Sequence, residues 1–250
     1  MSSKSILIIA SYTVSNLVRF FCDLCCVGRY PLDVVAHKAE GCLYVADWAE
    51  GGERGGRVWR VSLSGSVSQF LDDIDKPRKL SLVGDRLLIV GGGRLVVCRL
   101  PEGKTLSEVV LPVADPQHAV ELLDGEGRLA YLVGHGESSD VPHRVSRLEV
   151  SSTGTVTVVQ SYGGEGRGSG PGELSWPAHV SLAAGDGRVI VADCDNHRVL
   201  VLDSRLRLER VVLTKDDHDI ETPRRLCYVD HAGLLLVGIN FGCVDVYRIK

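Results

Sequence analysis

The sequence predicts an all-β protein, a six-bladed β-propeller, and three features of the chain lead to this prediction. Short apolar runs alternate with turns rich in Gly, Asp and Asn along the whole chain. These runs recur in units of four strands with a period of about 40 residues, which is typical of a propeller blade. The 250 residues include 28 Gly and one Met, which favours many turns over long helices in one large β domain.

The most complete unit runs from residue 176 to residue 213. A first strand within 176–182 contains the opening proline, Pro177, and a second strand over 188–193 follows the turn Gly-Asp-Gly. A third strand over 199–203 and a last apolar run over 206–213 complete the unit. We expect the second strand of every unit to be its most apolar and most buried strand.

The same pattern recurs along the chain, so we expect one domain of six units. The expected units span residues 1–30, 31–76, 77–115, 116–175, 176–221 and 222–250. The first unit has no proline-anchored first strand, and the last unit ends after its third strand, so both terminal blades are expected to be incomplete. Because an open seam would expose unpaired backbone groups, either the chain is a fragment of a longer protein or the first blade is thin. We favour the first alternative, a protein that continues upstream of Met1.

One segment resembles a known repeat. Residues 191–199, Val-Ala-Asp-Cys-Asp-Asn-His-Arg-Val, are similar to the V-A-D-x-x-N-x-R-V core of NHL repeats, and the glycine-rich residues 162–174 resemble the lead-in of that family. Asp47 keeps the motif aspartate in another unit, whereas three other units have glycine there. The resemblance implies a propeller of the kind found at the C-terminus of tripartite-motif ubiquitin ligases. The RING, B-box and coiled coil of those proteins are not present in this sequence.

The polar residues of this motif are expected to have a structural role. Asp193 and Asn196 can hydrogen-bond to the backbone of their own turn. The guanidinium of Arg198 offers a fork of donors that can reach carbonyl or carboxylate oxygens between blades.

The overall charge and the cysteines exclude several classes of protein. A net charge of −4 gives no global signature of a DNA-binding protein. No run approaches the ~18 apolar residues of a membrane span, and polar residues interrupt the apolar stretch at residues 5–14, so we expect a cytoplasmic protein with free thiols. The cluster Cys22, Cys25 and Cys26 lacks the second ligand pair of a structural zinc site. We expect no cofactor.

An enzyme is the less favoured interpretation. The chain has no G-x-S-x-G motif, and its glycine-rich segment 164–170 precedes a strand instead of the helix that a phosphate-binding loop requires. Glu121 is the one carboxylate well inside a predicted innermost strand, too few for an all-oxygen metal site. A zinc ion held by Asp33, His118 and His179 is conceivable, so a metal-dependent propeller hydrolase or lyase remains an alternative.

The favoured function is a non-enzymatic scaffold that binds a protein partner. The long inserts 49–56, 134–142 and 163–174 are expected on one face of the propeller, together with the loops that join the blades. Variable loops on a rigid scaffold are a common location for binding.

A basic mouth of the central channel gives the candidate site. The two positions after each blade-opening proline hold Leu32 and Asp33, Arg78 and Lys79, Gln117 and His118, Ala178 and His179, and Arg224 and Arg225. The candidate binding residues are Arg78, Lys79, His118, His179, Arg224 and Arg225. They predict an anion-binding mouth for single-stranded RNA or another acidic ligand, with histidine protonation adding charge below about pH 6.5. The alternative is a ring of ion pairs with Asp33, Asp75, Asp115 and Glu221.

Overall fold

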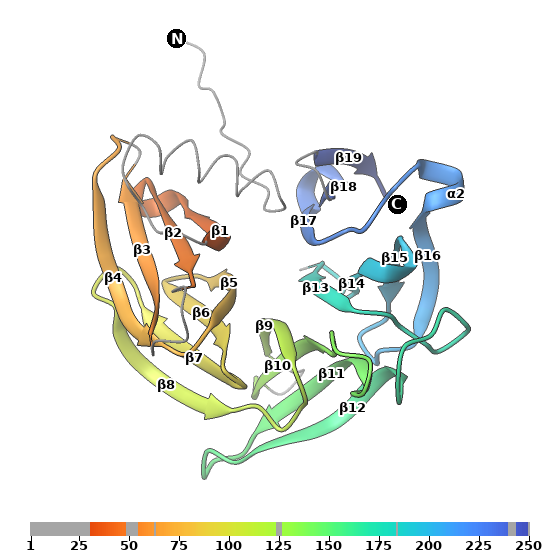
Figure 1. Cartoon of the computed structure of the whole chain (residues 1–250), viewed down its shortest axis with the longest axis horizontal. Coiled ribbons are helices and arrows are strands. Elements are labelled where there is room, and N and C mark those ends of the chain that lie inside the picture. Colours follow the sequence, from red (N-terminus) through yellow and green to blue (C-terminus); the bar gives the residue numbers. More distant parts are fainter. Residues whose placement is uncertain are drawn as a thin grey trace.

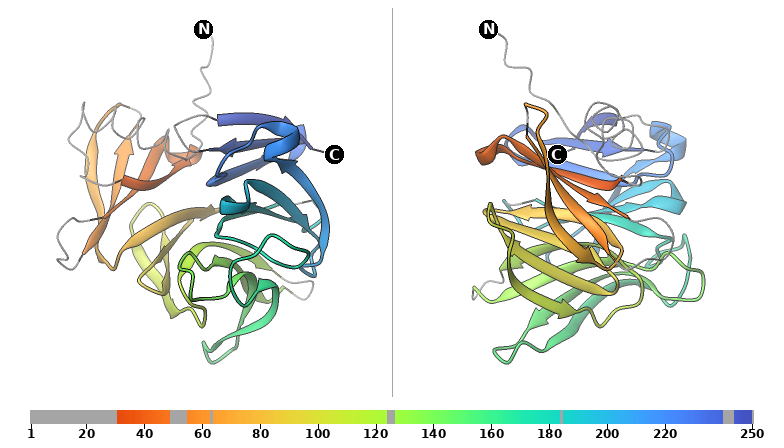
Figure 2. Two further views of the ribbon diagram at one scale, coloured as in Figure 1. Left: turned by 45° about the vertical axis from the view of Figure 1, so that its right-hand side comes forward. Right: turned by 60° about the vertical axis from the view of Figure 1, so that its left-hand side comes forward.

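The computed structural model describes residues 31–48, 55–62, 64–123, 127–183, 185–239 and 244–249. These residues form five antiparallel sheets around a central axis (Figure 1), and tilted views show each sheet twisting outward from the centre (Figure 2). The described helical segments are one four-residue helix, α2 (Lys215–His218), and three short 3₁₀ turns. The prediction of an all-β propeller is therefore confirmed.

The number of blades differs from the prediction. The structure shows five blades instead of six, and the expected first unit, residues 1–30, lies outside the described residues. Four of the described blades have four strands and the last has three, as expected for an incomplete final blade. The cysteine cluster at residues 22–26 also lies outside the described residues.

We number the described blades 1 to 5 in chain order, each with its first strand innermost. Blade 1 contains β1 (Pro31–His37), β2 (Cys42–Asp47), β3 (Gly56–Ser62) and β4 (Val67–Ile74); blade 2 contains β5 (Pro77–Val83), β6 (Arg86–Gly91), β7 (Arg94–Arg99) and β8 (Lys104–Val110); blade 3 contains β9 (Pro116–Leu123), β10 (Leu129–His135), β11 (His143–Val150) and β12 (Val156–Gly164); blade 4 contains β13 (Pro177–Leu182), β14 (Val189–Asp193), β15 (Arg198–Leu202) and β16 (Leu208–Thr214); blade 5 contains β17 (Arg225–Val229), β18 (Leu234–Gly238) and β19 (Val244–Arg248). The 3₁₀ turns are η1 (Lys38–Glu40), η2 (Cys194–Asn196) and η3 (Asp230–Ala232).

The hydrophobic core lies between neighbouring blades. Four clusters of buried apolar side chains fill the four spaces between successive described blades. The second strands supply much of this core: every residue of β2 and β14 is buried, and β6, β10 and β18 are buried except at their first residue. The expected burial of the second strands is confirmed. A strand in a sheet whose two faces are both covered by other blades has a continuous apolar sequence.

The turns that open blades 2 to 5 have an unusual backbone. The residues directly before the opening prolines of blades 2 to 5 all have a positive φ: 45° at Lys76, 51° at Asp115, 55° at Trp176 and 42° at Thr222. Residues other than glycine rarely adopt this left-handed conformation. The proline that follows fixes its own φ, so the chain turns sharply and enters the inner strand in a defined direction.

A bulge directly after the proline completes this opening turn. In blades 1, 2 and 4 the pairing between the first two strands shifts from the proline to the second residue after it, and blade 3 has the equivalent shift at Gly134. The intervening residue therefore has no partner across the ladder. This register places the first residue after the proline at the mouth of the channel. The second residue after the proline lies at the start of the channel wall.

Glycine replaces the motif aspartate in blade 2. Gly91 pairs with Pro77 as Asp193 pairs with Pro177, and a Cβ on Gly91 would lie 2.5 Å from the carbonyl oxygen of Asp75. No side chain can be accommodated at this distance without a shift of the backbone. In blade 3 the register places His135, and not Gly134, opposite the opening Pro116, so the expectation of glycine at the motif position was wrong there.

Replacing Val191 by Asp should destabilise the protein by several kcal/mol. Val191 is fully buried between blades 3 and 4, where an unpaired carboxylate would lose its hydration. The melting temperature of the variant measures the effect. Val159→Asp on the outer strand β12, where Val159 is half exposed, is the matched control, and equal melting of both variants would contradict the buried position.

Candidate functional site

The polar residues of the blade 4 motif form a closed network around a buried carboxylate. Asp193 has no exposed surface. Its Oδ2 accepts hydrogen bonds from Arg198 Nε at 2.6 Å and from Asn196 Nδ2 at 2.8 Å, and its Oδ1 accepts one from the Ser175 amide at 2.7 Å. Burial raises the pKa of Asp193, and these hydrogen bonds oppose that shift.

The same network fastens the glycine-rich segment that joins blades 3 and 4. The two terminal nitrogens of Arg198 donate to the carbonyl oxygens of Ser169 and Glu173, each at 2.9 Å, and Asn196 donates to the carbonyl of Gly168 at 2.8 Å. The guanidinium fork thus bonds to one carboxylate and two carbonyls at once. The structural role expected for the motif is confirmed.

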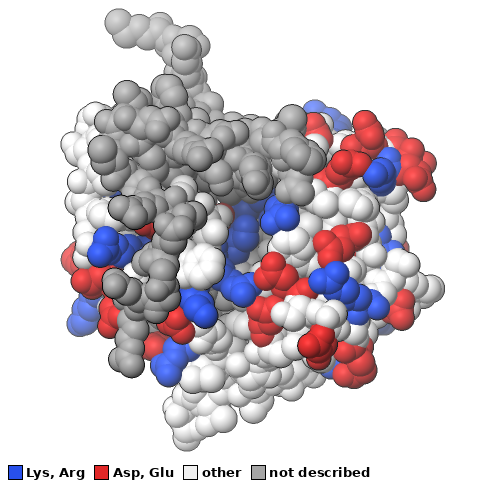
Figure 3. Space-filling view, in the orientation of Figure 1, with Lys and Arg blue, Asp and Glu red and all other residues white. Residues whose placement is uncertain are grey.

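The mouth of the channel holds a pocket of about 280 Å³, here called the mouth pocket. Its lining residues are Leu32, Trp48, Lys76, Arg78, Lys79, Gln117, Glu137, Trp176 and Arg224. Four of them are cations and one is an acid. The space-filling view shows Lys and Arg side chains gathered around the hollow at the centre of the ring (Figure 3).

Arg78 is already neutralised by acidic neighbours. Its guanidinium lies 3.1 Å from an Asp115 carboxylate oxygen and 2.7 Å from one of Glu137. Glu137 comes from the insert between β10 and β11, so one of the inserts expected on the loop face does reach the mouth. For Arg78, the prediction that the basic residues form ion pairs with neighbouring acids is therefore correct.

Three other cations of the mouth pocket have no carboxylate partner among the described residues. They are Lys76, Lys79 and Arg224. The Arg224 guanidinium lies 4.4 Å from the centre of the Trp176 ring, which holds it by a cation–π contact. The Trp176 amide donates to His143 Nδ1 at 2.8 Å, and its indole Nε1 donates to Gln117 at 3.4 Å, so the ring is held in place.

Five second-position residues, one from each described blade, form what we call the inner ring: Asp33, Lys79, His118, His179 and Arg225. Arg225 donates to Asp33 Oδ2, which also accepts from the Leu80 amide at 2.8 Å. The imidazoles of His118 and His179 stack with ring centres 3.7 Å apart. The structure therefore divides the predicted site: Arg78 and Arg224 lie at the mouth, the two histidines and Arg225 lie in the ring, and Lys79 belongs to both.

Burial changes the charge state of the ring. It lowers the pKa of Lys79, and it lowers the pKa of His118 and of His179 well below 6.5, with the nearby Lys79 and Arg225 charges acting in the same direction. Both histidines are therefore neutral near pH 6.5. The expected gain of positive charge below that pH was wrong, because the sequence did not show how deeply these rings are buried.

The zinc site considered for Asp33, His118 and His179 is also corrected. Among the described residues, these three do not bring a ligand atom each into one metal-sized cluster. Arg225 forms an ion pair with Asp33. The positive charges of Lys79 and Arg225 lie near both histidines and would repel a metal ion. The described residues that do cluster in this way are His37, Glu40 and Cys42, where Arg60 lies 3.1 Å from Glu40.

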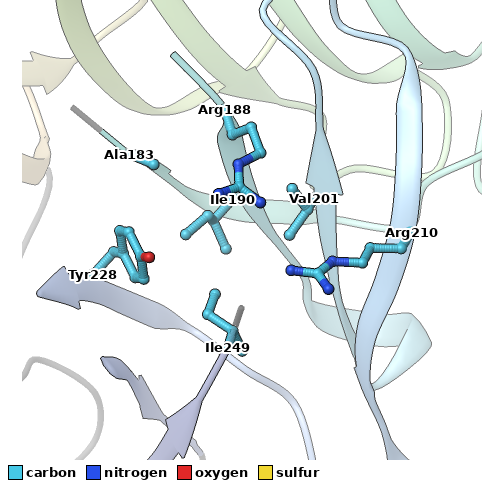
Figure 4. A pocket seen from close by; sticks show the side chains of 7 residues that line it. All are labelled: Ala183, Arg188, Ile190, Val201, Arg210, Tyr228 and Ile249. Atoms are coloured by element: carbon cyan, nitrogen blue, oxygen red, sulfur yellow. The ribbon is translucent and has the colours of Figure 1, made fainter. Parts of the chain in front are cut away.

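Two other hollows have less defined chemistry. One of about 480 Å³ between blades 1 and 2 is bordered by Asp73, Asp75 and the Arg94–Glu108 ion pair. Another, between blades 4 and 5, has room for roughly one water molecule at about 10 Å³ (Figure 4). Neither hollow brings cations that have no carboxylate partner among the described residues next to aromatic rings, as the mouth pocket does.

The sequence analysis missed Lys76, Trp48, Trp176 and Glu137. Lys76 and Trp176 each precede a blade-opening proline, so the position before proline was a usable signal. Trp48 is 47% exposed, and its position next to a predicted strand does not indicate whether its side chain is exposed or buried.

Within the described residues, no helix has the length and apolar character of a membrane span.

The fold and this arrangement define the class as a β-propeller, and comparisons with known proteins agree. Residues 174–202 match the sequence model of the family described as NHL repeat. The chain is therefore a β-propeller that contains a recognisable NHL repeat in blade 4. The comparison with curated protein sequences finds no significant match.

Solved propellers with different activities share this fold. One chain of a nidogen–laminin complex superposes with a TM-score of 0.57 at 13% identity, covering 88% of this chain and 80% of that chain. A putative 6-phosphogluconolactonase from Bacteroides uniformis gives 0.56 at 12%, and a streptogramin B lyase gives 0.53 at 14%, both over 88% of this chain and 68% of theirs. Such identities show a common fold alone.

Replacing Arg198 by Lys should loosen residues 165–175 without unfolding the propeller. Lysine can pair with Asp193 but cannot also reach two carbonyls, a loss of about 2 kcal/mol. Hydrogen exchange at the Gly168 amide, which bonds to Leu174, should become at least tenfold faster. Arg207→Lys is the control, because Arg207 makes an exposed ion pair with Asp203. If the Gly168 amide exchanges equally fast in both variants, Arg198 does not hold residues 165–175 in place.

The free energy of unfolding should fall as the pH decreases from 6.5 to 4. Burial lowers the pKa of His135 to about 4, whereas an unfolded histidine titrates near 6.5. Above pH 6.5 both states are neutral; below it the unfolded chain binds protons first, which costs about 2 kcal/mol at pH 5 for His135 alone. Urea denaturation at pH 7.5 and pH 5 measures this loss. His135→Gln should reduce it, and His231→Gln, at an exposed position, should not.

Proposed function

We propose that this propeller is a non-enzymatic binding module whose loop face takes a protein partner, with the mouth pocket as the anchor for an acidic segment of that partner. The observation that carries the proposal is the cation excess of the pocket. Lys76, Lys79 and Arg224 line about 280 Å³ of space and have no carboxylate partner among the described residues. Carboxylates of an acidic segment would supply the missing partners.

The geometry also keeps the cost of binding low. The pocket residues are set by the opening turns of rigid inner strands, and Arg224 is already held over Trp176. A preorganised site loses little conformational entropy when it binds. The loops around the mouth would add the contacts that select one partner.

Single-stranded RNA is the second candidate. Trp48 is 47% exposed beside the cations of the pocket. An exposed indole can stack on a base, which contributes about 1–3 kcal/mol per base. Two tryptophans and a basic pocket thus provide stacking and phosphate contacts in one place.

The double variant Lys76→Ala/Arg224→Ala should bind acidic ligands about tenfold more weakly or worse, since each charged hydrogen bond contributes about 1.5–3 kcal/mol. These residues are better targets than Arg78 and Arg225, which already hold ion pairs. Fluorescence anisotropy of a labelled deca-glutamate peptide and a ten-nucleotide RNA, at several salt concentrations, measures the loss.

The control is Lys104→Ala/Arg205→Ala, which removes two exposed cations at the ends of strands opposite to the mouth. It should bind as the parent does. A parent that binds neither probe at low salt, or a mouth variant that binds like the parent, would exclude the anchor. Tighter binding of the RNA that depends on Trp48 would favour the second candidate.

A further inference from the structure

The inner ring contains polar groups that its own fold leaves unpaired. Asp33 and His118 each accept from a backbone amide of the next blade, Leu80 at 2.8 Å and Val180 at 3.4 Å. His179 occupies the equivalent position in blade 4 and is 3% exposed, yet neither of its ring nitrogens has a hydrogen-bond partner among the described residues. A buried group without a partner costs about 1–3 kcal/mol.

The Lys79 ammonium is also unpaired, as are the buried atoms Asp33 Oδ1 and His118 Nε2 among the described residues. No described residue accepts a hydrogen bond or forms an ion pair with the Lys79 ammonium, and Asp33, the carboxylate that acts on it, is held by Arg225. Lys79 also lines the mouth pocket. It therefore connects the ring to the space through which a ligand would enter.

The charges around these groups favour an anion over a cation. His118, Lys79 and Arg225 act electrostatically on His179, and Asp33, Arg225, Arg224 and Cys194 act on Lys79. The two arginines and the lysine exceed the one carboxylate. A water molecule could accept from His179 but would leave the Lys79 charge without a counterion.

We propose that the inner ring is a binding site for a small oxyanion, a carboxylate or a phosphate-like group, held by the Lys79 ammonium and an N–H of His179. The group enters through the mouth pocket, and in this respect alone the proposal rests on the proposed function. Its source is either a free ion or a carboxylate side chain of the bound partner. Both present the same oxygen acceptors to the same two donors.

Sulfate binding to the whole chain tests the site, because sulfate keeps its charge between pH 5 and pH 8. The melting temperature and titration calorimetry are followed at millimolar sulfate and constant ionic strength with chloride. The parent should show a saturable response. Lys79→Met removes the charge at similar size and should abolish the response, and His179→Phe, which keeps a ring to stack on His118, should weaken it about tenfold.

The pH dependence adds a readout that a purely structural role would not move. Both histidines are neutral near pH 6.5, so the charge that meets the anion is that of the Lys79 ammonium, whose pKa burial lowers. Sulfate should therefore bind more weakly to the parent as the pH rises from 6.5 to 8, because Lys79 loses its proton. His179→Phe, which keeps Lys79, should retain this dependence. A parent without a saturable response, or variants that bind sulfate like the parent, would overturn the proposal.

The source of the oxyanion is resolved by adding the deca-glutamate peptide. If the peptide displaces sulfate in a manner that depends on Lys79, a carboxylate of the partner fills the ring. If the peptide binds through Lys76 and Arg224 without displacing sulfate, the ring holds a free ion. If the peptide does not bind but sulfate does, the acidic partner is wrong and the ring site stands.

Discussion

The left-handed turn before the opening prolines of blades 2 to 5 is the constraint on which the rest of the structure depends. Each such residue costs about 1–3 kcal/mol of backbone strain, and the described blades use four of them. Hydrogen bonds from the preceding blade offset that cost, since His143 Nδ1 accepts from the Trp176 amide and His197 Nδ1 accepts from the Thr222 amide. The turn therefore joins neighbouring blades as well as directing the inner strand.

This turn also determines which chemistry meets at the axis. Because every inner strand begins in the same way, equivalent positions of different blades converge, whatever residues they hold. Arg225 and Asp33 neutralise each other across the ring, whereas Lys79 and His179 have no partner in the part of the chain that the structure describes. The uneven distribution of partners around a nearly regular frame separates structural residues from residues available for a ligand.

The repeated frame was readable from the sequence because its determinants are local. Prolines fixed the starts of the inner strands, apolar runs fixed the buried second strands, and Asp193 with Arg198 identified the motif. The partners across the ring were not readable, since Arg225 and Asp33 are 192 residues apart in the chain. The depressed pKa of His179 also depends on burial between blades, and the number of blades depends on segments whose repeats are degenerate.

The basic mouth has a consequence for how ligands arrive. The chain carries a net charge of −4, so the cations at the mouth are an island of opposite sign on an acidic molecule. The net charge would repel an approaching anion at a distance, whereas the cations of the mouth would attract it near the opening. Such a field orients the ligand before contact and raises the rate of productive encounters, and it weakens as salt shortens the screening length. The same asymmetry would keep two copies of the chain from meeting mouth to mouth.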